Sequence, residues 1–184
     1  MDKKELVFRL IKADEEASMI CQSKERIEVI IGGGSVLMIN NLLSRQTQDI
    51  DTIGNPYGAH SELKEVFEKY DINPRMNTFA LNLADNWENR LNKVDLGYKT
   101  ILLDYYTISI EDLVIMKLHS HRGKDANDIR TKEVLNAIDW DLLQNIIDSG
   151  EANNSFNERE YKEFLTRYKE YKKEIGRQDE RTKF

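Results

Sequence analysis

Long apolar runs, cysteine and proline are all scarce in this chain, and each shortage excludes something. No apolar stretch approaches the roughly 20 residues of a membrane-spanning helix, and acidic side chains throughout the N-terminal segment are untypical of a signal peptide. The single cysteine, Cys21, cannot form an internal disulfide and is interpreted as a small buried hydrophobe. We therefore expect a cytoplasmic protein with no membrane association. Only two prolines, with 33% charged residues, favour a helix-rich chain.

An excess of positive charge is also missing, since the 184 residues carry a formal net charge of −6. Broad binding to a nucleic-acid backbone relies on clustered lysine and arginine, and this composition argues against it. A local basic site that holds phosphates remains compatible with the acidic total.

Two kinds of pattern divide the chain near Ile108. Before it, helix-like segments (residues 2–22, 35–43 and 60–70) alternate with strand-like ones (26–31, 49–54, 76–84 and a strand ending near Tyr106). After it the pattern is helical, and its last segment carries an aromatic stripe that predicts a docked face or a contact with RNA or a partner. We expect an α/β (α+β) core, residues 1–108, with a small mixed sheet flanked by helices. Residues 109–184 would form a helical region packed on it.

Three consecutive glycines, residues 32–34, follow the first predicted strand. A phosphate-binding P-loop would need a Gly-Lys-Ser/Thr run after its first glycine, which the sequence lacks, and a dinucleotide fingerprint would need glycine at Leu37. What remains is a strand, a glycine turn and a helix that begins near Ser35, a residue type common at helix caps. Such a turn binds phosphate or simply connects the two elements tightly.

Asp49 and Asp51 are two residues apart on a predicted strand and should point to the same face. Without a cation the two carboxylates would repel each other, and Mg²⁺ favours this ligand type together with substrate phosphates. A calcium-binding EF-hand loop is excluded, because Ile53 and His60 replace required ligands. A haloacid-dehalogenase-type phosphatase, which uses D-x-D at the end of a hydrophobic strand, stays an alternative, as does an exposed strand face without function.

Taken together, these elements resemble a known signature. An apolar strand, Gly32-Gly33, a helix and the run RQTQDID, from Arg45 to Asp51, closely resemble the motif of the nucleotidyltransferase superfamily with its polymerase-β-like fold. The resemblance implies that the glycines and the helix N-terminus hold a triphosphate and that the two carboxylates bind Mg²⁺ or Mn²⁺.

A later segment, SIEDLVIMKLHSHRGKDANDI, resembles a second motif of small bacterial nucleotidyltransferases that include AbiE-type toxins. The resemblance implies that Lys117 contacts nucleotide phosphates and that Asp125 positions this lysine or assists the nucleophile. Asp128, on the same helix face as Asp125, would orient or cap, and Arg122 lies close by. A salt-bridged helix-turn-helix is the structural alternative.

The resemblance departs from the family pattern in one respect. Many members carry a third acidic residue on a later strand, for which Asp95 and Asp104 are the candidates here. The number of metal ions stays open for this reason.

We therefore predict transfer of a nucleoside monophosphate from an NTP to an acceptor hydroxyl of RNA (tRNA included), protein or a small molecule. A toxin of a toxin–antitoxin pair, with an antitoxin protein as partner, is one form of this prediction. The alternatives are a degenerate nucleotide- or partner-binding module and the phosphatase. The predicted site comprises the catalytic Asp49, Asp51, Lys117 and Asp125, the phosphate-binding Gly32, Gly33, Gly34, Ser35, Arg45 and Lys117, the metal ligands Asp49 and Asp51, and the supporting Thr47, Arg122 and Asp128.

Overall fold

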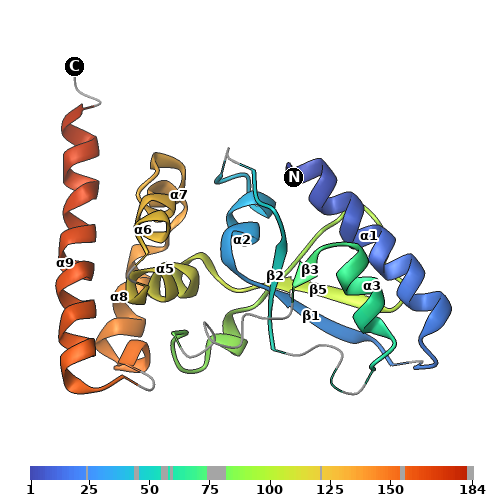
Figure 1. The fold of residues 1–184 in the computed structure, drawn as a ribbon. Coiled ribbons are helices and arrows are strands. Elements are labelled where there is room, and N and C mark those ends of the chain that lie inside the picture. Colours follow the sequence, from blue (N-terminus) through green and yellow to red (C-terminus); the bar gives the residue numbers. More distant parts are fainter. Residues whose placement is uncertain are drawn as a thin grey trace. The chain divides into compact units, whose positions relative to one another are not determined.

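The chain forms two compact units in a computed structural model (Figure 1). The structure describes all residues except 24, 44–45, 55–57, 59, 74–81, 121, 154–155 and 182–184, and for residues 174–181 it describes the backbone alone. One unit comprises Met1–Ala80 and Glu88–Ser109, and the other comprises Leu81–Trp87 and Ile110–Phe184.

The first unit is built on a mixed sheet, which confirms the expected α/β class. Its described strands follow the order β3-β2-β1-β5-β4, with β1 parallel to β5 and antiparallel to β2, β2 parallel to β3, and β4 antiparallel to β5. The elements are α1 (Lys3–Ile20), β1 (Ile27–Ile31), α2 (Gly33–Ile39), β2 (Ile50–Ile53), α3 (Leu63–Lys69), β3 (Ile72–Asn73), β4 (Asn92–Lys93) and β5 (Leu103–Thr107). Most of the strand expected over residues 76–84 lies outside the described residues, and its last three are not in a strand.

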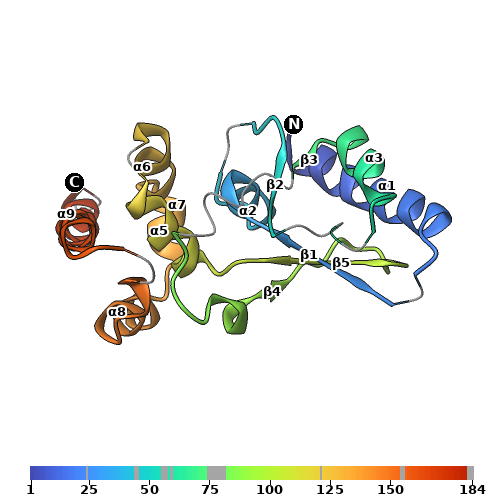
Figure 2. The same ribbon diagram turned by 60° about the horizontal axis from the view of Figure 1, so that its bottom comes forward.

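Helices α1 and α3 lie side by side against one face of this sheet (Figures 1 and 2). Alternation in β1 turns Ile27, Val29 and Ile31 into the core and leaves Glu28 exposed. Tyr105 of β5 lies beside Val29 in the parallel register and contacts α1: its hydroxyl donates to the Leu10 carbonyl oxygen at 2.8 Å. Alternate residues of each strand therefore face away from α1.

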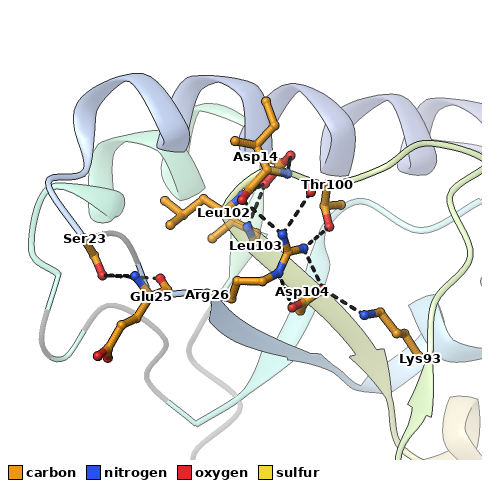
Figure 3. A network of polar contacts seen from close by, with 10 residues as sticks. Asp14, Ser23, Glu25, Arg26, Lys93, Thr100, Leu102, Leu103 and Asp104 are labelled. Atoms are coloured by element: carbon orange, nitrogen blue, oxygen red, sulfur yellow. Dashed lines mark hydrogen bonds and ion pairs between the residues drawn. The ribbon is translucent and has the colours of Figure 1, made fainter.

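A buried carboxylate fastens α1 to the start of β5 (Figure 3). Asp14 is fully buried, and its two oxygens accept hydrogen bonds from three consecutive backbone amides, those of Ile101, Leu102 and Leu103, at 2.7, 2.8 and 2.7 Å. Three charge-assisted donors satisfy an anion that water no longer solvates. This contact is specified by residues 87 to 89 positions apart and has no local sequence signal.

A second polar contact in the same network joins the beginnings of β1 and β5 (Figure 3). The Arg26 guanidinium binds both carboxylate oxygens of Asp104, at 2.5 Å from Nε and 2.8 Å from Nη2, and Lys93 lies 3.1 Å from the same carboxylate. Hydrogen bonding from Arg26, followed by Lys93, lowers the pKa of Asp104 to about 2, against the opposing effect of burial. Asp104 thus has built-in cationic partners.

The second unit is helical throughout its longer segment. Its helices are α5 (Ile110–His119), α6 (Gly123–Ile129), α7 (Lys132–Ala137), α8 (Trp140–Asp148) and α9 (Glu158–Arg181), with a short 3₁₀ turn at Glu151–Asn153. The aromatic stripe of α9 is a docked face: Phe164 and Tyr171 are fully buried, and the Tyr171 hydroxyl donates to the Ile129 carbonyl oxygen at 2.6 Å. Among the described residues, no helix has both the length and the apolar character that crossing a membrane requires.

Candidate functional site

The glycine segment forms the turn between β1 and α2. Gly32 caps α2 in an extended conformation, and Gly33, with φ +60°, is already the first helical residue. The helix therefore starts two residues earlier than expected and ends at Ile39, so the predicted span of residues 35–43 is wrong at both ends. Ser35 does not cap the helix, because it lies inside the first turn and is fully buried.

The sheet register brings this turn against the aspartate segment. Strands β1 and β2 pair Ile31 with Thr52, and the Gly32 N–H donates to the Asp51 carbonyl oxygen at 2.9 Å. A β-carbon on Gly33 would lie 2.5 Å from Asp51 Oδ2 and 3.3 Å from Asp51 Cβ, so the Asp51 side chain would have to shift to make room for it. Two features therefore favour glycine at position 33: its positive φ, and the Asp51 side chain, which lies where a β-carbon would be.

Asp49 is held through its backbone. It lies just before β2, and its carbonyl oxygen accepts two hydroxyl hydrogen bonds, from Ser35 Oγ at 3.2 Å and Thr47 Oγ1 at 3.1 Å. Ser35 belongs to α2, so its bond joins the helix to the chain that enters β2, whereas the Thr47 bond is local. The side chains of Asp49 and Asp51 are both half-exposed. Arg45, the predicted phosphate ligand, lies outside the described residues.

The two candidates for a third carboxylate have other partners. Asp104 lies beside Glu28, at the end of β1 remote from Gly32, where Arg26 and Lys93 bind it. Asp95 is exposed and accepts the Gly97 N–H at 2.8 Å. The β5 residue beside Ile30, nearer to the glycine turn, is Tyr106. Within the described part of the first unit, the predicted metal ligands thus remain Asp49 and Asp51.

This donor set fits a hard divalent cation. The Asp51 carboxylate lies beside the glycine turn, and the half-exposed Asp49 is two residues away in the chain. Carboxylate oxygens are the ligands that Mg²⁺ takes together with substrate phosphates. The phosphatase alternative would place the first aspartate at the end of a strand, whereas Asp49 precedes β2 and Asp51 lies within it. The position of the two aspartates at the start of β2 therefore disfavours the phosphatase.

In the second unit, α5 and α6 form a buried ionic cluster around Lys117. The Lys117 side chain is 4% exposed, and its Nζ lies 2.7 Å from Asp125 Oδ1 and 3.0 Å from Asp128 Oδ2. The i, i+3 spacing does place both carboxylates on one helix face, as expected. The other oxygen of Asp125 accepts from Ser120 Oγ at 2.7 Å, and the exposed Arg122 lies 3.6 Å from it.

Lys117 and Ser120 determine the ionisation of Asp125. Burial raises the pKa of the Asp125 carboxyl, but the hydrogen bonds from Lys117 and Ser120 outweigh it, so the pKa falls below its ordinary value. The resulting ionised carboxylate fixes the position of the ammonium group. Nearby His119 has a packing role: its ring stacks on Phe156 and Phe164, with centroids 3.8 and 4.1 Å away, and Nε2 lies 3.1 Å from the Ala152 carbonyl oxygen.

One group of possible ligands has no counterpart among the sequence predictions. Cys21, His60 and Glu62 lie together in the first unit, and among the described residues they form the one group of three or more such side chains whose ligand atoms all lie within 4.8 Å of one another. The spacing along the chain is too long to form a local motif. The only local signal is the lone cysteine, which by itself indicates no more than a small hydrophobe.

Comparison with known protein families gives one match, which includes both motifs. The family described as "Nucleotidyltransferase of unknown function (DUF6036)" matches residues 8–176 and so covers both the glycine–aspartate segment and the Lys117 cluster. Neither the curated proteins nor the solved structures gave a match. The resemblance drawn from the sequence motifs is confirmed at the level of the family.

Proposed function

The chain belongs to this family of nucleotidyltransferases, and we propose that it transfers a nucleoside monophosphate from an NTP to an acceptor hydroxyl in a Mg²⁺-dependent reaction. The contact between Gly33 and Asp51 is the observation that carries this proposal. It places a carboxylate directly against the glycine turn, so that a metal ligand and a phosphate-binding backbone are neighbours.

Within the first unit, the roles of the residues follow from their contacts. Asp49 and Asp51 would hold Mg²⁺, which when bound neutralises phosphate charge and polarises the reacting oxygens. The Gly32 N–H is engaged with Asp51, so the amides of Gly33 and Gly34, in the first turn of α2, would bind the phosphates. In the reaction the acceptor oxygen bonds to the α-phosphorus and the bond to pyrophosphate breaks. One of the two carboxylates would accept the hydroxyl proton.

In the second unit, we assign a phosphate-binding role to Lys117. A lysine ammonium is a compact charge suited to phosphate, and the two carboxylates hold it at a defined place on α5. Asp125 and Asp128 would then be positioning residues. Arg122, exposed at the start of α6, would add a second cation.

The experiment is a transfer assay with α-labelled NTPs and Mg²⁺, offering total RNA, proteins and small-molecule hydroxyl compounds as separate acceptors. We expect label transfer and an equal release of pyrophosphate from the native chain. Asp49→Ala/Asp51→Ala should lose about 10³-fold or more of the rate. A charge-matched control, Glu65→Ala/Glu68→Ala, removes two exposed carboxylates of α3 and should keep the activity.

The same proteins are compared by thermal unfolding with Mg²⁺ and NTP. A ligand at 100 times its Kd raises the free energy of unfolding by about 2.7 kcal/mol. Equal shifts for the native chain and the aspartate variant would refute the site. Shifts without transfer to any acceptor would instead indicate a binding module, such as a protein that acts through an antitoxin-like partner. Release of inorganic phosphate with an aspartyl-phosphate would indicate the phosphatase.

A further inference from the structure

Cys21, His60 and Glu62 meet at one end of the α1–α3 pair. Cys21 caps the C-terminus of α1, and Glu62 occupies the corresponding cap position at the start of α3, two residues after His60. The Cys21 sulfur lies 3.7 Å from His60 Nδ1 and 3.3 Å from Glu62 Oε1. A thiol, an imidazole and a carboxylate thus converge from segments that are 39 and 41 positions apart.

The two separations from the sulfur agree with those of a tetrahedral zinc site, and all three ligand atoms lie within 4.8 Å of one another. With Zn–S near 2.3 Å and Zn–N or Zn–O near 2.0 to 2.1 Å, tetrahedral angles place sulfur about 3.5 Å from each of the other ligand atoms. The observed 3.7 and 3.3 Å bracket this value. We propose that Cys21, His60 and Glu62 form a binding site for Zn²⁺.

The donor set selects the metal. A thiolate with an imidazole suits Zn²⁺, whereas Mg²⁺ prefers oxygen ligands in octahedral geometry. Metal binding replaces the S–H···O bond between Cys21 and Glu62 and releases the thiol proton to solvent. Three protein ligands leave the fourth tetrahedral position to a water molecule.

The position of the site indicates a structural consequence. Helices α1 and α3 run antiparallel: Arg9 binds Asp71, just beyond the end of α3, Lys69, the last residue of α3, lies 2.6 Å from Glu16, and Cys21 meets Glu62 at the start of α3. The first two contacts are exposed or half-exposed ion pairs, which contribute little. A zinc ion would fix the remaining end of the pair with stronger, directional bonds.

This site is separate from the aspartate segment. Cys21 precedes β1 and Gly32 follows it, so the whole strand, about 16 Å long, lies between the two. Zinc binding is therefore proposed independently of nucleotidyl transfer, and either proposal can fail without the other.

Cobalt(II) substitution provides the test, because a thiolate ligand gives an intense near-ultraviolet charge-transfer absorption that oxygen ligands do not give. The chain has a single cysteine, so any such absorption must come from Cys21. The tag-free 184-residue chain, kept reduced, is titrated with Co²⁺ and then with Zn²⁺. We expect one equivalent of Co²⁺ to produce the absorption and Zn²⁺ to displace it. Asp49→Ala/Asp51→Ala should behave like the native chain.

Ligand variants then test the geometry. Cys21→Ser should lose the absorption, while His60→Gln and Glu62→Gln should weaken Co²⁺ binding at least about tenfold. Circular dichroism of each variant establishes that it is folded, and the conservative Glu62→Gln keeps the test valid should Cys21→Ser not fold. Absence of the absorption in the native chain would overturn the proposal. It would also be overturned if both His60→Gln and Glu62→Gln bound Co²⁺ with native affinity, since the thiol would then be acting alone.

Discussion

The glycine–aspartate segment of the first unit and the Lys117 cluster of the second treat their carboxylates in opposite ways. Asp49 and Asp51 are half-exposed, and the carbonyl oxygen of each accepts hydrogen bonds that fix the backbone. Asp125 and Asp128 are buried, and their side chains themselves bind the Lys117 ammonium. The first arrangement fixes the chain through its carbonyl oxygens and leaves the side chains half-exposed, whereas in the second the carboxylates themselves hold the Lys117 ammonium in place.

Paired carboxylates in a sequence can therefore mean two different things. A half-exposed pair, one member of which lies beside a glycine turn, is suited to bind a cation from solvent, whereas a buried pair that holds a lysine positions that lysine instead. Substitutions in the two regions should consequently differ in the size and kind of their effects.

The largest effect on stability should come from Lys117→Met. Removing the ammonium leaves two buried carboxylates next to each other, and breaking a buried ion pair in this way costs about 3–5 kcal/mol in the free energy of unfolding. Adding Asp125→Asn and Asp128→Asn should recover part of this loss, because the two carboxylate charges that faced Lys117 are then removed as well. Urea unfolding measures both. Lys124→Met, which replaces an exposed lysine of α6, is the control and should change stability by no more than about 0.5 kcal/mol.

Gly33→Ala should have the next largest effect. A β-carbon there would collide with the Asp51 carboxylate, which adds about 1–3 kcal/mol of overpacking to the cost of a positive φ. Gly97→Ala is a matched control, since Gly97 has φ +63° and nothing lies within 4 Å of the place that its β-carbon would occupy. Both variants should be destabilised, but only Gly33→Ala should suffer the additional loss and reduced transfer. Equal stabilities of the two would remove Gly33 from the proposed site.

The two hydroxyls that hold the Asp49 carbonyl should show a coupled effect. Either Ser35→Ala or Thr47→Val alone leaves one hydrogen bond to that oxygen and should cost about 0.5–1 kcal/mol. The double variant removes both donors and should cost more than the sum of the single changes. A double-mutant cycle by urea unfolding measures the difference. If the losses in unfolding free energy of the two single variants simply add, the two hydroxyls fix Asp49 independently, which would contradict the prediction.

A smaller effect than that of the double hydroxyl variant concerns Asp104, a carboxylate of the first unit that pairs with Arg26 and Lys93. Its pKa of about 2 in the folded chain is below the ordinary 3.8, so its ion pair stabilises the fold above pH 3.8 and this contribution is lost as the pH falls toward 2. Because Arg26 is 43% exposed, solvent screening limits the effect to about 1 kcal/mol. The difference in unfolding free energy between the native chain and Asp104→Asn should accordingly shrink between pH 5 and pH 2. A constant difference would contradict the proposed compensation.

Much of the fold could be predicted from local patterns. The strand at Ile27–Ile31, the first helix and the helical second half follow from periodicity, because alternation and 3.6-residue spacing are properties of contiguous residues. The start of α2 could not be predicted in this way, because Ser35 is a common cap type while the glycines that open the helix are poor helix formers. Tertiary packing overrides that preference: Ser35 is buried and bonds to Asp49 instead.

Residue types at short spacing were enough to identify the class of the fold and the family, and they give Asp49 and Asp51 their expected chemistry. Which groups meet depends on folding. The β1–β2 register puts the Asp51 carboxylate against Gly33, and helix packing brings Cys21 to His60 and Glu62. Residues that are distant in the chain become neighbours only when strands pair and helices pack, and no local pattern encodes that pairing.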